Sequence, residues 1–228
     1  NIIISLNDIH GLWGGRDISI SGSGETFIEI VGPKRPEIGL YVKEYRLSLS
    51  ESEIKNLIDL FIENDFLTIE EPVRKEVLPD ETRPTIILEN SKKEKHVVSM
   101  WYSDIEKNEK FARIYQSILL LEEKTKNLTP FFEGKFSFSC DELEREIKSW
   151  LEEIKYCEND SECVVESRYY CPFGCYQFYN KNTNLSLIDK KVEIFNNNYC
   201  HPCEYECITP PTLDELKCIN KKCVDIRY

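Results

Sequence analysis

In the first half of the chain, polar and apolar residues alternate with a period of two, which is the pattern of a half-buried β-strand. Residues 25–31 carry the clearest alternation, and residues 40–49 can form a second strand. Residues 85–89 and 95–100 flank a polar turn, so they predict a β-hairpin. Residues 1–24 are rich in Gly and Ser, and we expect them to be irregular or to lie at a sheet edge.

Two other segments follow the spacing of an amphipathic helix. Each begins with a capping-box sequence, a serine followed three residues later by a glutamate: Ser50 with Glu53, and Ser103 with Glu106. The apolar residues behind these caps are Ile54, Leu57, Ile58, Phe61 and Ile62 in the first helix and Phe111, Ile114, Tyr115, Ile118 and Leu119 in the second. The order β-β-α-β-β-α predicts an α+β fold, in which two helices pack against one antiparallel sheet.

A change of pattern then marks a boundary. Residues 127–134 contain turn signals and are the predicted linker. We expect a cysteine-free α+β domain at residues 1–130 and a second, cysteine-rich domain at residues 135–228. The second domain opens with another capping box, Ser139 with Glu142, so a third amphipathic helix should follow.

Cys140 and Cys157 lie on the same stripe as the apolar residues of this third helix, one at each end. Their sulfur atoms should therefore face the domain core and hold both ends of the helix. The remaining elements expected are strands at residues 163–166, 177–179, 191–195 and 223–228 and a short capped helix at residues 212–218. The second domain is thus predicted to be a small disulfide-rich α+β domain.

The cysteines are distributed unevenly along the chain. All of them follow residue 139, namely Cys140, Cys157, Cys163, Cys171, Cys175, Cys200, Cys203, Cys207, Cys218 and Cys223. An even number of cysteines in a small domain is typical of disulfide-stabilised proteins from an oxidising compartment. We therefore expect five disulfides and a secreted, periplasmic or cell-surface location, while the pairing stays open.

The segment Cys200-His201-Pro202-Cys203 permits two other interpretations. Together with Cys207 and a second cysteine pair it could bind zinc, although the spacing of the second pair does not fit a standard site. It also has the C-x-x-C form of thiol–disulfide oxidoreductases, but it lacks the strand and helix that flank the motif in those enzymes. We therefore predict no metal and no cofactor, and keep both interpretations as alternatives.

Residues 157–163 place an acidic turn between two cysteines. Asp160 and Glu162 could contact Ca²⁺, but one short cluster offers too few oxygens for a tight site, so a structural turn is expected. The stretch resembles the acidic turn of small secreted disulfide domains, including whey-acidic-type protease inhibitors. An inhibitor-like module is therefore a further alternative.

A wider resemblance covers most of the chain. Cys163-Val164-Val165, followed by C-P-F-G-C-Y at residues 171–176 and by Asn180-Lys181, resembles an uncharacterised cysteine-rich domain of exported bacterial proteins. The first half similarly resembles a small α+β domain of bacterial lipoproteins. These resemblances imply an exported bacterial protein, and they bring no catalytic motif.

Charge and hydropathy narrow the range of partners. The formal net charge is −12, and an acidic surface repels nucleic-acid phosphates, so no nucleic-acid partner is expected. No apolar run is long enough to span a membrane. The chain starts at Asn1 without a leader, so we expect a signal or lipoprotein leader to have been removed, and a lipid anchor on that leader is possible.

The sequence contains no recognised catalytic motif and only three histidines. We therefore expect a non-catalytic binding or interaction module at the cell envelope or outside the cell, whose partner is a protein or another extracellular ligand. The alternative from another class is a thiol–disulfide or zinc-dependent enzyme that uses Cys200, His201 and Cys203.

Overall fold

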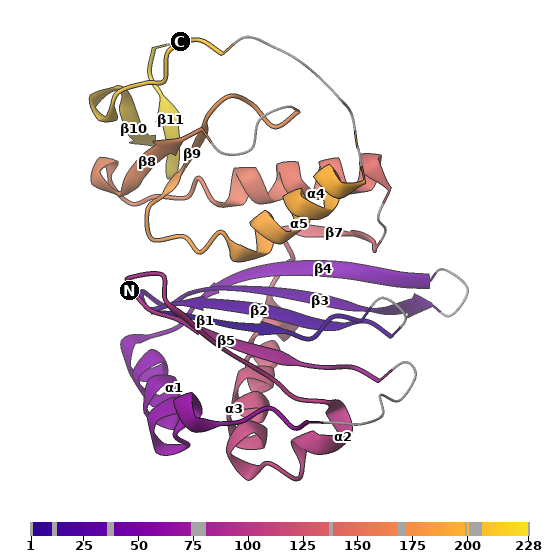
Figure 1. Cartoon of the computed structure of the whole chain (residues 1–228). Helices are drawn as coiled ribbons and strands as arrows, with labels where there is room; N and C mark the ends of the chain where they lie inside the picture. The colour runs from indigo at the N-terminus through magenta and orange to yellow at the C-terminus, as the bar shows by residue number, and fades with distance from the viewer. Residues whose placement is uncertain are drawn as a thin grey trace. The chain divides into compact units, whose positions relative to one another are not determined.

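The computed structural model describes residues 2–10, 13–35, 39–73, 81–136, 139–167, 172–198, 200 and 207–227. The chain divides into two compact units, Asn1–Phe136 and Ser137–Tyr228 (Figure 1). Both units combine helices with antiparallel strands. The α+β class expected from the sequence is therefore confirmed.

The first unit is built on a seven-stranded antiparallel sheet in the order β6-β5-β1-β2-β3-β4-β7. Its strands are β1 (Ile3–Asn7), β2 (Gly15–Ser21), β3 (Glu25–Arg35), β4 (Gly39–Ser48), β5 (Thr85–Glu89), β6 (Lys95–Ser99) and β7 (Phe132–Lys135). The expected hairpin β5–β6 forms, with Ile87 opposite Val97.

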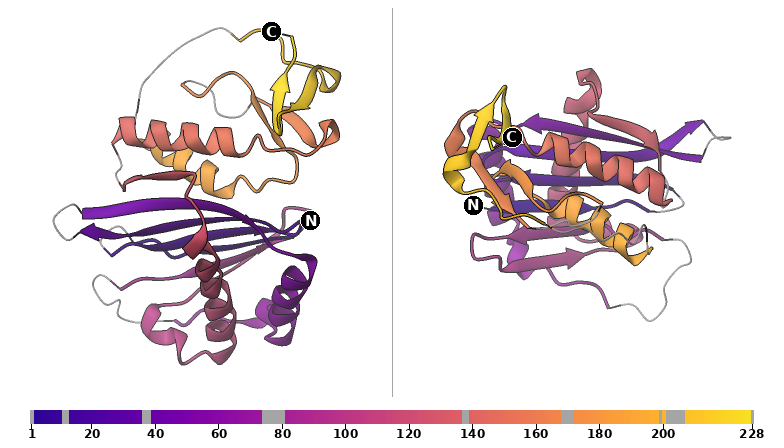
Figure 2. Two further views of the ribbon diagram at one scale, coloured as in Figure 1. Left: turned by 180° about the vertical axis from the view of Figure 1, so that it is seen from behind. Right: turned by 90° about the horizontal axis from the view of Figure 1, so that it is seen from above.

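The helices of this unit are α1 (Glu51–Glu63), α2 (Tyr102–Ile105) and α3 (Glu109–Leu119), with 3₁₀ turns η1 (Phe66–Thr68) and η2 (Leu120–Asn127). In Figure 1 and in the rear view of Figure 2, α1 and α3 lie on the same side of the sheet. They bury their apolar faces against Leu6, Ile18 and Ile86, which are all 0% exposed. This core fixes the helices on the sheet, because apolar burial is the main favourable contribution to folding.

The predicted capping box of α1 is present in both directions. Glu53 N donates to Ser50 Oγ at 3.4 Å, and Ser50 N donates to the Glu53 carboxylate at 2.8 Å. Lys124 pairs with the same carboxylate at 2.5 Å. Lys124 and Ser50 together lower the pKa of Glu53 to about 2.

Three sequence expectations for this unit are wrong. Residues 1–24 are not irregular, since β1 and β2 lie inside the sheet and bury Ile4, Leu6, Ile18 and Ile20. The predicted linker contains β7, which pairs with β4 as part of the sheet. Phe132 of β7 packs on Val31 and Val42. The helix expected from Ser103 is interrupted, because Asn108 caps α3 by accepting the N–H of Phe111 at 3.0 Å.

The described residues of the second unit form two helices and two hairpin-like pairs of strands. The helices are α4 (Cys140–Glu153) and α5 (Ser186–Asn197), the 3₁₀ turns are η3 (Asp160–Glu162) and η4 (Leu213–Glu215), and the strands are β8 (Cys163–Glu166), β9 (Gln177–Asn180), β10 (Leu216–Ile219) and β11 (Lys222–Asp225). The predicted helix behind Ser139 and the strands β8 and β9 are confirmed.

Two expectations for the second unit are wrong. Residues 191–195 are helical, because Ile188, Val192 and Phe195 lie on one buried face of α5 at helical spacing. The capping box at Thr212 forms, but the helix expected to reach residue 218 is a single 3₁₀ turn that leads into β10. Among the described residues, no helix combines the length and apolar character that crossing a membrane requires.

Candidate functional site

Every cysteine that the structure describes is in a disulfide. The bridges are Cys140–Cys200, Cys157–Cys218, Cys163–Cys223 and Cys175–Cys207. Cys171 and Cys203 lie outside the described residues. The disulfide character predicted for the second unit is therefore present in four bridges.

The first two bridges hold the two ends of α4, as its apolar stripe predicted. Cys140 is the first residue of the helix, and its Cα lies 5.3 Å from that of Cys200. Cys157 follows the helix, is fully buried, and bonds to Cys218. Because each bridge connects residues about 60 positions apart, the pairing also ties α4 to distant parts of the unit.

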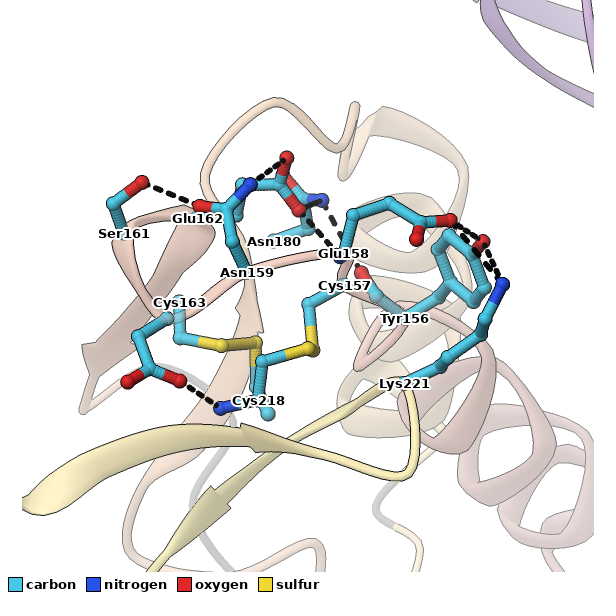
Figure 3. The surroundings of a disulfide bond; sticks show 12 residues. Tyr156, Cys157, Glu158, Asn159, Ser161, Glu162, Cys163, Asn180, Cys218 and Lys221 are labelled. Atoms are coloured by element: carbon cyan, nitrogen blue, oxygen red, sulfur yellow. Dashed lines mark hydrogen bonds and ion pairs between the residues drawn. A yellow bond between two sulfur atoms is a disulfide. The ribbon is translucent and has the colours of Figure 1, made fainter.

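Two adjacent bridges fasten the acidic turn to the β10–β11 hairpin. Cys218 and Cys223 face each other across this hairpin, and they bond to Cys157 and Cys163 at the two ends of the turn (Figure 3). The sulfurs of Cys157, Cys163 and Cys223 lie within 4.8 Å of one another, which is a spacing that could suit a metal ion. All three are disulfide sulfurs, however, and thiolates are what a metal requires.

The structure describes one of the two cysteines in the Cys200-His201-Pro202-Cys203 segment. Cys200 is bonded to Cys140, so it does not form the C-x-x-C disulfide with Cys203. His201 and Cys203 lie outside the described residues. The arrangement therefore gives no support to a redox pair at Cys200.

The acidic turn is held by internal hydrogen bonds. The Glu162 carboxylate accepts from the backbone N of Glu158 at 2.7 Å and from the side chain of Asn159 at 3.1 Å (Figure 3). Asp160 accepts from the backbone N of Cys218 at 2.8 Å and pairs with Lys217 at 3.2 Å. These contacts lower the pKa of Asp160, with the Cys218 bond as the largest cause. Both candidate Ca²⁺ ligands thus already stabilise the turn.

The first unit contains a concave site that the sequence analysis did not single out, and we call it the polar pocket. Its volume is about 450 Å³, within the range of small-molecule sites, which is roughly 300–1,000 Å³. The lining residues are Asp8, Trp13, Gly14, Gly15, Arg16, Ile30, Val31, Gly32, Thr82, Tyr102, Tyr115, Gln116 and Leu119. They come from the β1–β2 connection, the start of β2, β3, the segment before β5, α2 and α3.

Two glycines shape the wall of this pocket. Gly14 has a φ of +78° and exchanges two backbone hydrogen bonds with His10, of 2.8 and 2.9 Å. A Cβ on Gly14 would lie 2.1 Å from the carbonyl oxygen of Val31, and one on Gly15 would lie 1.9 Å from that of Asp8. Only glycine permits the connection to approach the neighbouring backbone this closely.

Asp8 is the central polar group of the pocket. Its Oδ2 accepts a 2.7 Å hydrogen bond from the hydroxyl of Tyr115. Its backbone N–H donates to Asp17 Oδ1 at 2.9 Å, which fixes the start of the connection. Burial raises the pKa of Asp8 above its usual value, although the Tyr115 bond and the nearby Arg16 oppose the increase. Burial and the bond to Asp8 also raise the pKa of Tyr115.

Arg16 provides the opposite charge. Its Nε bonds to the carboxylate of Glu122, and both side chains are about one third exposed. Burial acts to lower the pKa of Arg16, but the bond to Glu122 and the nearby charges, of which Glu122 contributes most, together outweigh it and raise the pKa. Within the described part of the chain, no hydrogen bond takes Oδ1 of Asp8, the two amino groups of Arg16 or the side-chain amide of Gln116. The pocket therefore offers both an acceptor and several donors to a ligand.

Two aromatic side chains at the pocket are unusually exposed. Trp13 is 64% exposed and Tyr102 is 62% exposed, and both belong to the lining. Large exposed aromatic groups beside a polar cavity are typical of binding surfaces, since they combine apolar area with a polar tip.

The local sequence held a signal for this site. Trp13-Gly14-Gly15-Arg16 puts an aromatic and a cationic residue around two glycines, but nothing nearby in the sequence indicates Asp8's partner Tyr115. This four-residue motif alone is therefore compatible with an ordinary turn.

Comparison with known proteins identifies no relative of this chain, because no family model, no curated protein and no solved structure matches it.

Proposed function

We propose that this protein is an exported, non-catalytic binding protein whose cysteine-free unit holds a small hydroxyl-rich ligand, such as a pyranose sugar, in the polar pocket. The observation that carries the proposal is the combination of unpaired hydrogen-bonding groups on Asp8 and Arg16 with the exposed ring of Trp13. This refines the interaction module expected from the sequence by giving it a ligand class.

Export is supported by the cysteine chemistry. Four disulfides join eight described cysteines, and such density is typical of proteins that fold in an oxidising compartment. A periplasmic, cell-surface or secreted location fits this chemistry.

The hydrogen-bonding groups favour a neutral polyhydroxyl ligand. A sugar hydroxyl donates one hydrogen bond and accepts others, so neighbouring hydroxyls can donate to Asp8 and accept from Arg16 or Gln116. A zwitterionic amino acid would need Arg16 for its carboxylate, but Arg16 is already paired with Glu122, and both side chains are only about one third exposed, so this pair is less screened and exchanges less readily than a surface ion pair. The apolar C–H face of a pyranose ring would pack on Trp13 or Tyr102, which are exposed for such contact.

The carboxylates favour binding over hydrolysis. Glycoside hydrolases generally use a pair of carboxyl groups on opposite sides of the bond that they cleave. Among the residues described at the polar pocket, Asp8 is the one carboxylic acid that lines it. The Cys200–Cys140 bridge likewise gives no support to a thiol enzyme.

Isothermal titration calorimetry on the full chain tests the proposal. The panel contains glucose, galactose, mannose, N-acetylglucosamine and maltose, with glycine and leucine as zwitterionic comparisons. At least one sugar should bind, and Trp13→Ala should weaken it about tenfold, the effect of an aromatic contact of about 1.4 kcal/mol.

Ile62→Ala is the matched control, because Ile62 is 68% exposed and lies outside the polar pocket. It should leave sugar binding unchanged. If no sugar binds to the folded protein, or if both variants weaken binding equally, the proposal is wrong. If only the amino acids bind, the pocket is a ligand site but the ligand class is wrong.

A further inference from the structure

A second cavity of the first unit has the opposite chemistry, and we call it the apolar pocket. It has a volume of about 420 Å³ and lies between α1, η1 and the strands β1 and β5. Its lining is apolar except for two residues, Asp65 and Thr68, and consists otherwise of Ile2, Ile4, Ile58, Phe61, Ile62, Phe66, Leu67 and Leu88. None of these residues lines the polar pocket.

The inner wall of the apolar pocket is closely packed. Phe61 is 3% exposed and Phe66 is 1% exposed, and their rings pack edge to face with centroids 4.8 Å apart. Asp65 between them has a φ of +46°, and Thr68 Oγ1 donates to its carbonyl oxygen at 2.9 Å. The turn from α1 into η1 is thus set by the backbone and held by a hydrogen bond.

Two large apolar side chains of the same lining remain exposed to solvent. Ile62 is 68% exposed and Leu67 is 65% exposed. An apolar cavity bordered by exposed apolar groups indicates a binding surface. Single exposed leucines are common on protein surfaces, whereas exposed apolar side chains that cluster around a cavity mark binding sites.

The pocket also has a charged border. Asp65 lines it, and its Oδ2 pairs with Nζ of Lys110 at 2.9 Å. The two side chains are 62% and 49% exposed, so this ion pair is screened by water and weak. An incoming carboxylate can therefore exchange with Asp65 as the partner of Lys110.

We propose that the apolar pocket binds the hydrocarbon chain of a single-chain fatty acid, whose carboxylate is held by Lys110 at the border. The apolar lining accounts for the chain, and charge complementarity with Lys110 accounts for the acid group. The site is independent of the polar pocket, so a negative result for one binding proposal does not refute the other.

The probe for the test is N-phenyl-1-naphthylamine, whose fluorescence increases in apolar sites, bound to the full chain and displaced by dodecanoate or by dodecanol. Both competitors should displace the probe. Leu67→Glu should weaken probe binding about tenfold, because it places a charge in the apolar lining. Leu120→Glu is the matched control, because Leu120 is also 65% exposed but is absent from this pocket, and it should have no effect.

Two further variants test the position of the acid group. Lys110→Ala should lower dodecanoate affinity about threefold and leave dodecanol unchanged. Asp65→Asn should raise dodecanoate affinity about threefold, because it frees Lys110, and asparagine tolerates the positive φ of this position. A threefold change in affinity corresponds to the interaction energy of an exposed ion pair.

Two results would overturn the inference. The pocket assignment is wrong if the probe does not bind, or if Leu67→Glu and Leu120→Glu weaken it equally. The fatty-acid assignment is wrong if Lys110→Ala and Asp65→Asn leave the ratio of dodecanoate to dodecanol affinity unchanged. Trp13→Ala must not affect displacement, and an effect would contradict the independence of the two pockets.

Discussion

The hydroxyl of Tyr115, on α3, donates a 2.7 Å hydrogen bond to the carboxylate of Asp8, which follows β1 and lies 107 positions earlier in the chain. Tyr115 is 3% exposed, so this neutral hydroxyl holds the carboxylate in a fixed position within the pocket wall. Arg16, the nearby cation, is bonded to Glu122 instead. Asp8 is therefore a half-buried acid with one oxygen left for a ligand, which is the arrangement on which the proposed function rests.

Asp8→Asn should make the stability of the first unit less dependent on pH. Burial raises the pKa of Asp8 above 3.8, so the native state holds this proton more tightly than the unfolded chain does. The resulting stability is present below the unfolded pKa and is lost as the pH rises through the native pKa. Asparagine does not ionise and can still accept the Tyr115 hydrogen bond, so the variant should gain stability relative to wild type as the pH rises. Urea unfolding at pH 3, 5 and 7 measures this, and a variant that instead loses relative stability toward pH 7 contradicts it.

Gly14→Ala should destabilise the first unit by at least about 2 kcal/mol, since it combines a positive φ with a backbone clash. The new Cβ would lie 2.1 Å from the oxygen of Val31. Gly32→Ala is the control, because Gly32 lines the same pocket but has no atom within 4 Å of an added Cβ. It should change the free energy of unfolding by less than about 1 kcal/mol. Equal losses of unfolding free energy in the two variants would contradict the close approach of Gly14 to the backbone of Val31.

Replacing Cys157 and Cys218 together by alanine should destabilise the second unit by about 2–4 kcal/mol. The bridge joins residues separated by 61 positions and includes the fully buried Cys157. The Cys175–Cys207 bridge spans only 32 positions, so its removal should have an effect smaller by about 0.6 kcal/mol from loop closure alone. Calorimetric unfolding of the two double variants makes the comparison. The unfolding of the first unit, which contains no cysteine, should be unchanged in both.

Alkylation of the denatured but unreduced protein should label no more than two of the ten cysteines. The eight cysteines that the structure describes are bonded, and bonded sulfurs do not react with iodoacetamide. Intact mass before and after reduction counts the labels. Four or more labels without reduction, together with bound zinc, would refute the disulfide framework and favour the zinc alternative.

The sequence predicted those elements whose signal is local. The α1 cap needs only Ser50 and Glu53, and the stripe that ends in Cys140 and Cys157 follows from helical spacing. By contrast, Gly and Ser in residues 1–24 concealed the alternation of Ile18 and Ile20, although both are fully buried in β2.

Longer-range features were not predictable. Tyr115 meets Asp8 only because α3 packs on the sheet in which Asp8 follows β1, and this depends on the order of seven strands. The pairing of Cys157 with Cys218 likewise depends on the β10–β11 hairpin, which sets Cys218 opposite Cys223. Neither contact can be predicted from the spacing of residues in a single sequence.

If the polar pocket binds a sugar, the indole N–H signals of the tryptophans should report the contact. Trp13, Trp101 and Trp150 give one N–H cross-peak each in a ¹H–¹⁵N correlation spectrum, assigned by the loss of one peak in Trp13→Phe. On titration with each sugar of the panel to millimolar concentration, the Trp13 peak should shift, while that of the fully buried Trp150 should stay in place. A Trp13 peak that remains fixed with every sugar, or that moves only together with that of Trp150, would show that these sugars do not bind in the polar pocket.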